Sequence, residues 1–314
     1  MLSTGRRTIG VEPDIHTRLL AAAALEGSVT IPKKIGRFEI VGELGHGPMT
    51  VDYRANDPAT GRAIVLTVPS AESGDSPVLL ARFYREARAA GALQHPNIVA
   101  IYDLGVDRGA PYITSELLEG EDLGQIVERE KKEGGQSLQS AATLLDYIIQ
   151  ACKGLSFAHQ QGVIHRDVRP ANIFVTTRGI AKLTHFALAR LPHAWSRSTG
   201  VLVGDIDYAS PEQISGSRVD GGADIWAVGC TLYEILTYTK PFQAGTIKDW
   251  MLAILSQEPK PIVELRPDLP PEVDKVISRA LKKDRASRHR SMDDVVADLE
   301  RVARKMQSAA GAGP

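Results

Sequence analysis

Side chains that can transfer a proton or carry a charge are concentrated between His165 and Asn172. This segment reads H-R-D-V-R-P-A-N and lies between two short apolar runs, 162–164 and 173–175. Histidine and aspartate are among the side chains that most often donate or accept protons in enzymes. The spacing of these residues is informative, whereas a lone His-Arg-Asp is a weak signal.

The spacing H-R-D-x-x-x-x-N resembles the catalytic loop of the serine/threonine protein kinases, specifically the eukaryotic-like kinases of bacteria. Two short strands and Phe186 complete the pattern, and the resemblance extends from about Arg37 to Val302. It implies an α+β, bilobal protein-kinase fold. The N-lobe would be a small antiparallel sheet plus one helix, and the C-lobe would be larger and mainly helical. ATP and Mg²⁺ are the cofactors that the resemblance implies.

The flanking segments are expected to lie outside this domain. The extension before it predicts one short helix over 13–25, which either docks on a lobe or a partner or folds only weakly. The last residues are small and are expected to be disordered. The predicted division is an N-terminal extension 1–36, a kinase-like domain 37–305 (N-lobe 37–117, C-lobe 118–305) and a tail 306–314.

The resemblance assigns catalytic roles to three residues of the loop. Asp167 matches the residue that orients the substrate hydroxyl and accepts its proton. Asn172 matches the ligand of the second magnesium ion, and Arg169 stands where a lysine normally contacts the transferred phosphoryl group. The alternative is that these residues persist only as loop scaffolding, tied by their own hydrogen bonds.

One departure concerns the metal site directly. Where the family has Asp-Phe-Gly, this chain has His185-Phe186-Ala187. The missing aspartate is the family's main magnesium ligand. A neutral imidazole is a poor ligand for magnesium, which prefers hard oxygen donors, and a protonated one repels the metal. Asn172 is then left as a weak metal ligand.

Further departures fall around the expected nucleotide. Gly45 and Gly47 match the glycine-rich hairpin whose backbone N–H groups approach phosphate. Asp52 replaces a valine that packs on adenine, where a carboxylate would have to be desolvated against an apolar base at considerable cost. Val65 replaces the alanine above the adenine, which overfills a slot shaped for a flat base. Thr67 replaces the lysine that holds the α- and β-phosphates.

Other residues are placed around the nucleotide by the resemblance alone. Glu86 matches the glutamate that pairs with the strand lysine, so with Thr67 it loses its cation. Ser115 falls at the gatekeeper position. The remaining expected contacts are Glu116 and Leu118 of the hinge and Phe174.

The motifs with structural roles in the family are complete. By resemblance, His165 and Phe186 stack in the apolar column that couples the lobes. Glu212 and Arg288 match a buried ion pair at the base of the C-lobe, and Asp224 matches the residue that caps the catalytic-loop backbone. The mechanical framework is therefore expected to persist although the metal site is changed.

The composition limits the partners. A net charge of −1 gives no reason to expect nucleic acid or an anionic membrane. No apolar run approaches the roughly 18 residues of a membrane span, so no membrane insertion is expected. Cys152 and Cys230 lie in apolar helical patterns and are expected to be buried free thiols in a reducing cytoplasm.

The sequence thus predicts a pseudokinase: a kinase-like domain, impaired in catalysis, that serves as a scaffold or allosteric regulator in signalling. Its partner would be a protein, such as an active kinase or its substrate. One alternative is a weakly active or unconventional ATP-dependent serine/threonine kinase that uses Asp167, Arg169 and Asn172. Another is a nucleotide sensor that binds ATP without metal. Whether the protein is an enzyme stays open on sequence alone.

Overall fold

Alternation of apolar and polar residues builds the sheet of the N-lobe. In β3 (Thr50–Asp57), Val51, Tyr53 and Ala55 are buried, while Arg54 between them is exposed. A computed structural model describes residues 31–46, 50–70, 77–132, 140–186 and 206–311. In it, six antiparallel strands pair in the order β1-β2-β3-β4-β6-β5. The other strands are β1 (Lys34–Ile35), β2 (Phe38–His46), β4 (Arg62–Pro69), β5 (Ile101–Asp107) and β6 (Ala110–Glu116).

The C-lobe is built on two long helices that are largely buried. Helix α5 (Ala141–Gln160) begins at Ser140, whose side chain accepts the backbone N–H of Thr143. Nearly every residue of α7 (Gly221–Thr237) is buried, as expected for a helix that is apolar all round. The other helices are α4 (Leu123–Lys132), α6 (Pro211–Ile214), α8 (Ile247–Ser256), α9 (Ile262–Leu265), α10 (Pro271–Ala280) and α11 (Met292–Gly311), with 3₁₀ turns η1 (Pro170–Asn172), η3 (Ile206–Tyr208) and η4 (Arg285–Ser287).

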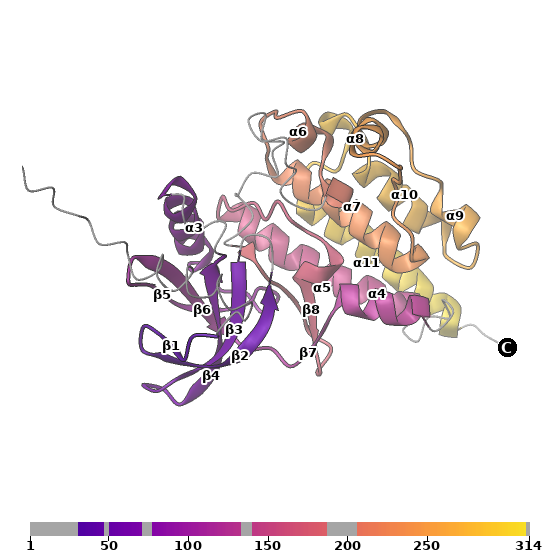
Figure 1. Cartoon of the computed structure of the whole chain (residues 1–314). Helices are drawn as coiled ribbons and strands as arrows, with labels where there is room; N and C mark the ends of the chain where they lie inside the picture. The colour runs from indigo at the N-terminus through magenta and orange to yellow at the C-terminus, as the bar shows by residue number, and fades with distance from the viewer. Residues whose placement is uncertain (1–30, 47–49, 71–76, 133–139, 187–205, 312–314) are drawn as a thin grey trace, which may run out of the picture.

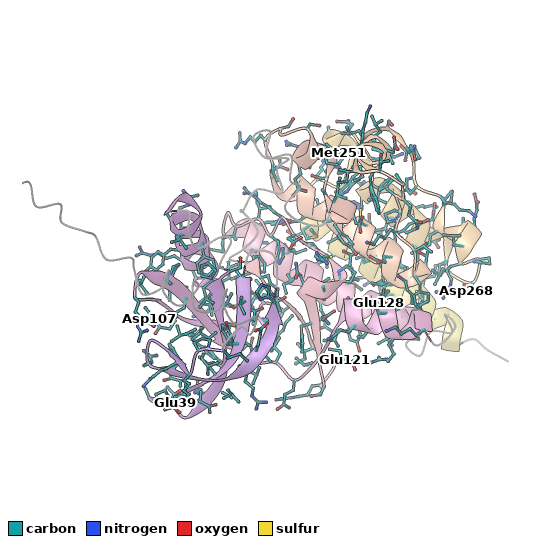
Figure 2. The ribbon with its side chains drawn as sticks, viewed as in Figure 1. Glu39, Asp107, Glu121, Glu128, Met251 and Asp268 are labelled. Atoms are coloured by element: carbon teal, nitrogen blue, oxygen red, sulfur yellow. The ribbon has the colours of Figure 1, made fainter. Side chains whose placement is uncertain are left out.

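One apolar cluster joins helix α3 (Pro77–Ala90) of the N-lobe to the C-lobe, and a second, smaller one lies within the N-lobe sheet. Figure 1 shows the N-lobe sheet at the lower left, with helix α3 above it, and the C-lobe helices at the upper right. The main buried cluster includes Phe83 of α3 and Leu183 of the C-lobe. A small sheet, β7 (Gly120–Asp122), β8 (Ile173–Thr176) and β9 (Ala181–Leu183), lies where the lobes meet. Charged side chains such as Glu39 and Glu128 lie on the outer surfaces (Figure 2).

The expected α+β, bilobal class is confirmed by this architecture. Two boundaries differ from the expectation. The sheet begins at Lys34, inside the predicted extension. Helix α11 continues to Gly311, so the expectation of a disordered tail from 306 is corrected for 306–311, because Met306 packs against the core and the following residues include good helix formers. The helix expected over 13–25 lies outside the described residues.

Within the described ranges, no helix combines the length and apolar character that a membrane crossing would need. Cys152 and Cys230 are both buried and free, as the sequence predicts.

Gly154 lies where helix α5 closely approaches β9 and residues 97–98. A Cβ at this position would lie 2.9 Å from the carbonyl oxygen of Asn97, 3.0 Å from Leu183 and 3.3 Å from Ile98. We predict that Gly154→Ala lowers the free energy of unfolding by about 1–3 kcal/mol, although alanine is the better helix former. Urea denaturation measures this change.

The control is Lys153→Ala at the adjacent position, whose side chain is 48% exposed. It should change the free energy of unfolding by less than about 1 kcal/mol. A Gly154→Ala variant as stable as the wild type would contradict the steric account.

Candidate functional site

The catalytic loop is held in shape by one buried carboxylate. Asp224 of α7 accepts the backbone N–H groups of His165 at 2.9 Å and Arg166 at 2.6 Å, and lies 2.7 Å from Nε2 of His159. Burial by itself raises the pKa of Asp224, but these hydrogen bonds and the charge of His159 outweigh it, so the pKa is lowered. An ionised Asp224 thus satisfies a turn in which Arg166 has φ of +68°. This geometry fits the capping role that the resemblance implies.

Asp167 and Asn172 are tied to each other. The amide nitrogen of Asn172 donates to the backbone oxygen of Asp167 at 2.7 Å and to its Oδ2 at 2.8 Å. Asn172 is buried, and its carbonyl accepts the N–H of Thr184 at 3.0 Å. These hydrogen bonds within the loop are expected if Asp167 and Asn172 only stabilise its shape. They also orient the Asp167 carboxylate, so the geometry is equally compatible with a catalytic role.

Arg169 lies near Tyr208, toward the end of the segment from about 188 to 210 that the resemblance identifies as the family's activation segment. Its guanidinium carbon is 5.7 Å from the centroid of the Tyr208 ring, a cation–π arrangement. Tyr208 donates its hydroxyl to Glu234 of α7. Arg169 does not line the cavity described below.

His165 and Phe186 stack as the resemblance implies. Their ring centroids are 4.5 Å apart at 67°, and both residues are buried. Burial lowers the pKa of His165, so the ring is neutral near pH 7. The neutral ring then donates from Nε2 to the carbonyl of Thr184 at 2.8 Å and accepts the N–H of Asp167 at Nδ1. Phe186 therefore lies inward, beneath the N-lobe.

Three departures from the family pattern lie in direct contact. Asp52 and Thr67 face each other across β3 and β4, and Thr67 Oγ1 donates to Asp52 Oδ1 at 2.5 Å. The second oxygen, Oδ2, lies 3.3 Å from Nε2 of His185 in the C-lobe. From the sequence, a carboxylate at Asp52 is expected to be costly to desolvate, and no partner for it is identified. The structure adds that this carboxylate has two partners, Thr67 and His185.

The electrostatics of this cluster are those of an ion pair. Burial raises the pKa of Asp52, but the hydrogen bond and charge of His185, with the Thr67 hydroxyl, lower it overall. Burial lowers the pKa of His185, but the bond to Asp52 and the charges of Asp52 and Asp167 outweigh burial and Arg169, so it is raised. Each group favours the charged form of the other.

A cavity of about 420 Å³ lies between the lobes beside this cluster. Every residue that the sequence placed at the nucleotide, and whose side chain the structure describes, lines it. Gly47 and Ala187 lie outside the described residues, as does the side chain of Glu86 on α3. The lining residues from that prediction are Gly45, Asp52, Val65, Thr67, Ser115, Glu116, Leu118, Phe174 and His185.

The described wall of the cavity does not fit a metal-bound triphosphate. None of its residues is a lysine or an arginine; its charged members are Asp52, Glu116, Asp122 and the pair partner His185. Arg54, on β3 beside the cavity, is exposed and does not line it. Nowhere in the described ranges do three or more His, Cys, Asp or Glu side chains converge as a metal site would require.

The hinge carries a contact that sequence reasoning missed. Glu116 Oε1 accepts the N–H of Ala100 at 2.8 Å and the ammonium of Lys182, on β9, at 2.6 Å. Glu116 thus links the end of β6 to the C-lobe. The opposite charges of Glu116 and Lys182 are visible in the sequence, but nothing local in the sequence brings these two residues together.

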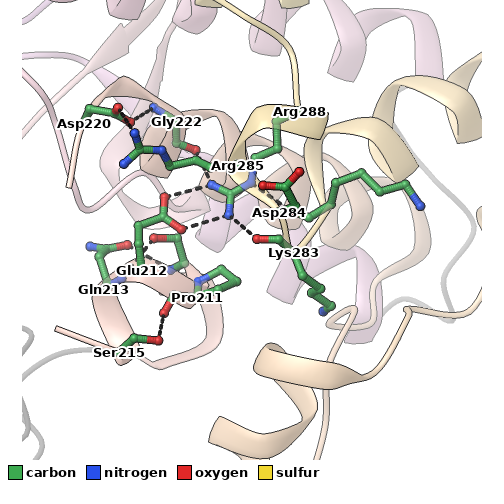
Figure 3. A network of polar contacts seen from close by, with 12 residues as sticks. Pro211, Glu212, Gln213, Ser215, Asp220, Gly222, Lys283, Asp284, Arg285 and Arg288 are labelled. Carbon is green, nitrogen blue, oxygen red and sulfur yellow. Dashed lines mark hydrogen bonds and ion pairs between the residues drawn. The ribbon is translucent and has the colours of Figure 1, made fainter. Parts of the chain in front are cut away.

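Below the site, Glu212 and Arg288 form a two-point ion pair (Figure 3). Nη1 and Nη2 of Arg288 donate to Oε1 and Oε2 of Glu212, each at 2.8 Å. The same guanidinium donates to the carbonyls of Gly222, Lys282 and Lys283. The pair therefore ties α6, where the activation segment ends, to the start of α7 and the segment after α10.

The fold and the cleft define a class: a bilobal domain with a ligand-sized cavity between a sheet lobe and a helical lobe, above a rigid polar loop. Residues 38–298 match the family model described as the protein kinase domain. The chain therefore belongs to the protein kinase family, among the eukaryotic-like serine/threonine kinases of bacteria.

Named relatives agree with this family. The chain is 36% identical over 282 residues to the serine/threonine-protein kinase PknB of Mycolicibacterium smegmatis, covering 87% of this chain and 44% of that protein. It is 34% identical over 277 residues to a probable serine/threonine-protein kinase of Streptomyces coelicolor, covering 86% of this chain and 40% of that protein. The chain thus spans about two fifths of the length of these relatives.

A solved structure agrees as well. The crystal structure of the Mycobacterium tuberculosis PknI kinase domain matches with a TM-score of 0.71 and 26% identity, covering 87% of this chain and 99% of that one.

The Glu212–Arg288 pair makes a pH-dependent contribution to stability. Burial raises the pKa of Glu212, but the bonds and charge of Arg288 lower it overall. The contribution is therefore present above the unfolded pKa of about 4.3 and is lost as pH falls through the lower folded pKa. We predict that Glu212→Gln lowers the free energy of unfolding by about 3–5 kcal/mol at pH 7.

The difference between wild type and Glu212→Gln should shrink in denaturation curves measured below about pH 4. Glu300→Gln, which removes the surface pair with Lys153, is the control and should cost less than about 1 kcal/mol. A difference for Glu212→Gln that stays constant from pH 7 to pH 3 would contradict the assignment.

Proposed function

We propose that this domain is a pseudokinase, impaired in phosphoryl transfer, that serves as a scaffold or allosteric regulator of a signalling protein in the cytoplasm. One observation carries the proposal. Asp52 bonds both Thr67, at the position of the phosphate-holding lysine, and His185, at the position of the magnesium-binding aspartate. A triphosphate entering there would meet a carboxylate in place of a lysine.

The size of the expected loss supports impaired catalysis. Removing one preorganised electrostatic contact typically costs about 10² to 10³ in rate. Two independent losses, at Thr67 and His185, would reduce a turnover of about 1–100 per second by roughly 10⁴ to 10⁶. Turnover would then take minutes to days, although such losses are often non-additive.

A protein partner is supported by the intact C-lobe. The Glu212–Arg288 pair anchors α6 and the Asp224 contacts shape the loop, so the surfaces around the substrate groove are held without need of catalysis. A partner such as an active kinase or its substrate suits a family whose named relatives are serine/threonine kinases. The net charge of −1 offers no support for nucleic acid.

The alternative is a weakly active or unconventional ATP-dependent serine/threonine kinase. The observation that favours it is the ordered Asp167–Asn172 contact, which leaves a carboxylate oriented on the catalytic loop beside Arg169. A further alternative is a sensor that binds ATP without metal.

Nucleotide binding separates these functions. We predict that ATP at millimolar concentration, with or without Mg²⁺, changes the melting temperature of the wild-type chain by less than about 1 °C. The variant Asp52→Val/Val65→Ala/Thr67→Lys/His185→Asp should gain a magnesium-dependent rise of about 4 °C or more if ATP then exceeds its Kd about a hundredfold.

A magnesium-dependent rise in the wild type would favour the kinase instead. A rise of the same size with and without magnesium would favour the sensor.

Residual catalysis is tested by transfer of radiolabelled γ-phosphate to a generic protein substrate. We predict that wild type and Asp167→Asn show the same background, because no transfer depends on that carboxylate. Transfer by the wild type that Asp167→Asn reduces by about 10²-fold or more would overturn the pseudokinase proposal.

A further inference from the structure

The Asp52–His185 contact joins the two lobes directly. Asp52 lies on β3 of the N-lobe sheet, and His185 directly precedes Phe186 in the C-lobe. Their side chains are 21% and 34% exposed, so the pair is partly shielded from water at the mouth of the cavity. Thr67 holds the Asp52 carboxylate from β4.

His185 adopts a backbone conformation that needs support. Its φ is +62°, in the left-handed region that few side chains adopt, although histidine, asparagine and aspartate do so more readily than most. Its Nδ1 lies 2.9 Å from Oγ1 of Thr184, and its Nε2 faces Asp52. With both ring nitrogens engaged, the strained backbone is fixed and Phe186 is directed inward onto His165.

A second link between the lobes lies at the end of β6. There Lys182 of β9 bonds Glu116 at the hinge. A hinge contact alone leaves one lobe free to rotate about it, whereas a second contact across the mouth opposes that rotation. Asp52, His185 and Glu116 line the same cavity, so the two contacts together restrict how far the lobes can open.

The polarity of the mouth contact is the reverse of the family arrangement implied by the sequence. That arrangement has a cation on the N-lobe strand and an anion before the phenylalanine, with a metal-bound phosphate between them. Here the anion, Asp52, lies on the N-lobe strand and the imidazole of His185 precedes the phenylalanine, so the two groups bond directly with no ligand between them.

We propose that Asp52 and His185 form a built-in clamp that holds the lobes closed and Phe186 inward in the absence of nucleotide. The closed arrangement is thus the resting state, and a partner meets a preformed surface. The clamp does not depend on the proposed function, since it would hold the lobes whether or not residual transfer occurs.

Hydrogen exchange at the strand beneath the clamp measures its strength. The amide of Leu183 donates to the carbonyl of Asn97 at 2.9 Å, and that of Thr184 donates to the carbonyl of Asn172 at 3.0 Å. Opening of the loop before Phe186 exposes these amides. Their exchange rates are therefore compared in the ligand-free chain, with helix α10 as an internal reference.

The variants form a double-mutant cycle: Asp52→Asn, His185→Asn and the two combined. Asparagine keeps the size of aspartate and tolerates the left-handed backbone at 185. Each single variant should speed exchange of the two amides about threefold to fivefold, the range of a partly exposed ion pair. The combined variant should be no faster than the singles, because both remove one contact. Lys153→Gln, which removes a surface pair elsewhere in the C-lobe, should leave these amides unchanged.

Unchanged exchange in the singles, or additive effects in the combined variant, would overturn the clamp. If a variant fails to fold, wild type alone decides: raising NaCl from about 0.05 to 1 M should speed exchange at Thr184, because a partly exposed pair is screened, and no change would overturn it. If wild type transfers phosphate and the double-mutant cycle still shows that Asp52 and His185 are coupled, the proposed function is wrong and the clamp is supported.

Discussion

A carboxylate placed between two lobes must find a partner, because leaving a charge in a partly dry cleft is costly. Asp52 meets this requirement with Thr67 beside it and His185 across the cleft. The contact fits the residue types at all three positions. A lysine at 67 would compete for the carboxylate, and an aspartate at 185 would repel it. The cleft therefore forms a self-consistent electrostatic arrangement that differs from that of a metal-dependent kinase.

Away from the cleft, the C-lobe keeps the buried polar contacts that the family pattern implies. Asp224 satisfies the catalytic-loop backbone, and Glu212 with Arg288 anchors the end of the activation segment. These contacts are buried, and their removal would leave uncompensated charge. Among the residues that would contact a nucleotide, Asp52, His185 and Glu116 instead make contacts between the lobes.

Much of the fold could be read from local patterns. The apolar period of α5 and the quoted motifs of the catalytic loop placed helices, strands and loop in order, because amphipathic spacing and backbone chemistry act over a few residues. The predicted nucleotide contacts whose side chains are described were found at the cavity, since each was matched through a motif, whereas apolar lining residues such as Ile98 and Ile113 were not predicted. Val65 and Phe174 are among the contacts that a motif placed correctly. The sequence did not predict how far α11 extends, because Met306 stabilises this end of the helix by packing against core residues that are distant in the sequence.

By itself the sequence determined the family, the bilobal architecture and the absence of the strand lysine and the metal-binding aspartate. Only the tertiary structure decided what replaced them. Asp52 and His185 are far apart along the chain, and their bond exists because the lobes bring β3 over the loop before Phe186. Likewise, only the fold pairs Glu116 with Lys182 at the hinge. The sequence shows which side chains carry a charge, but only the fold determines which of them lie close enough to pair. The energy of an ion pair falls with separation and with exposure to water.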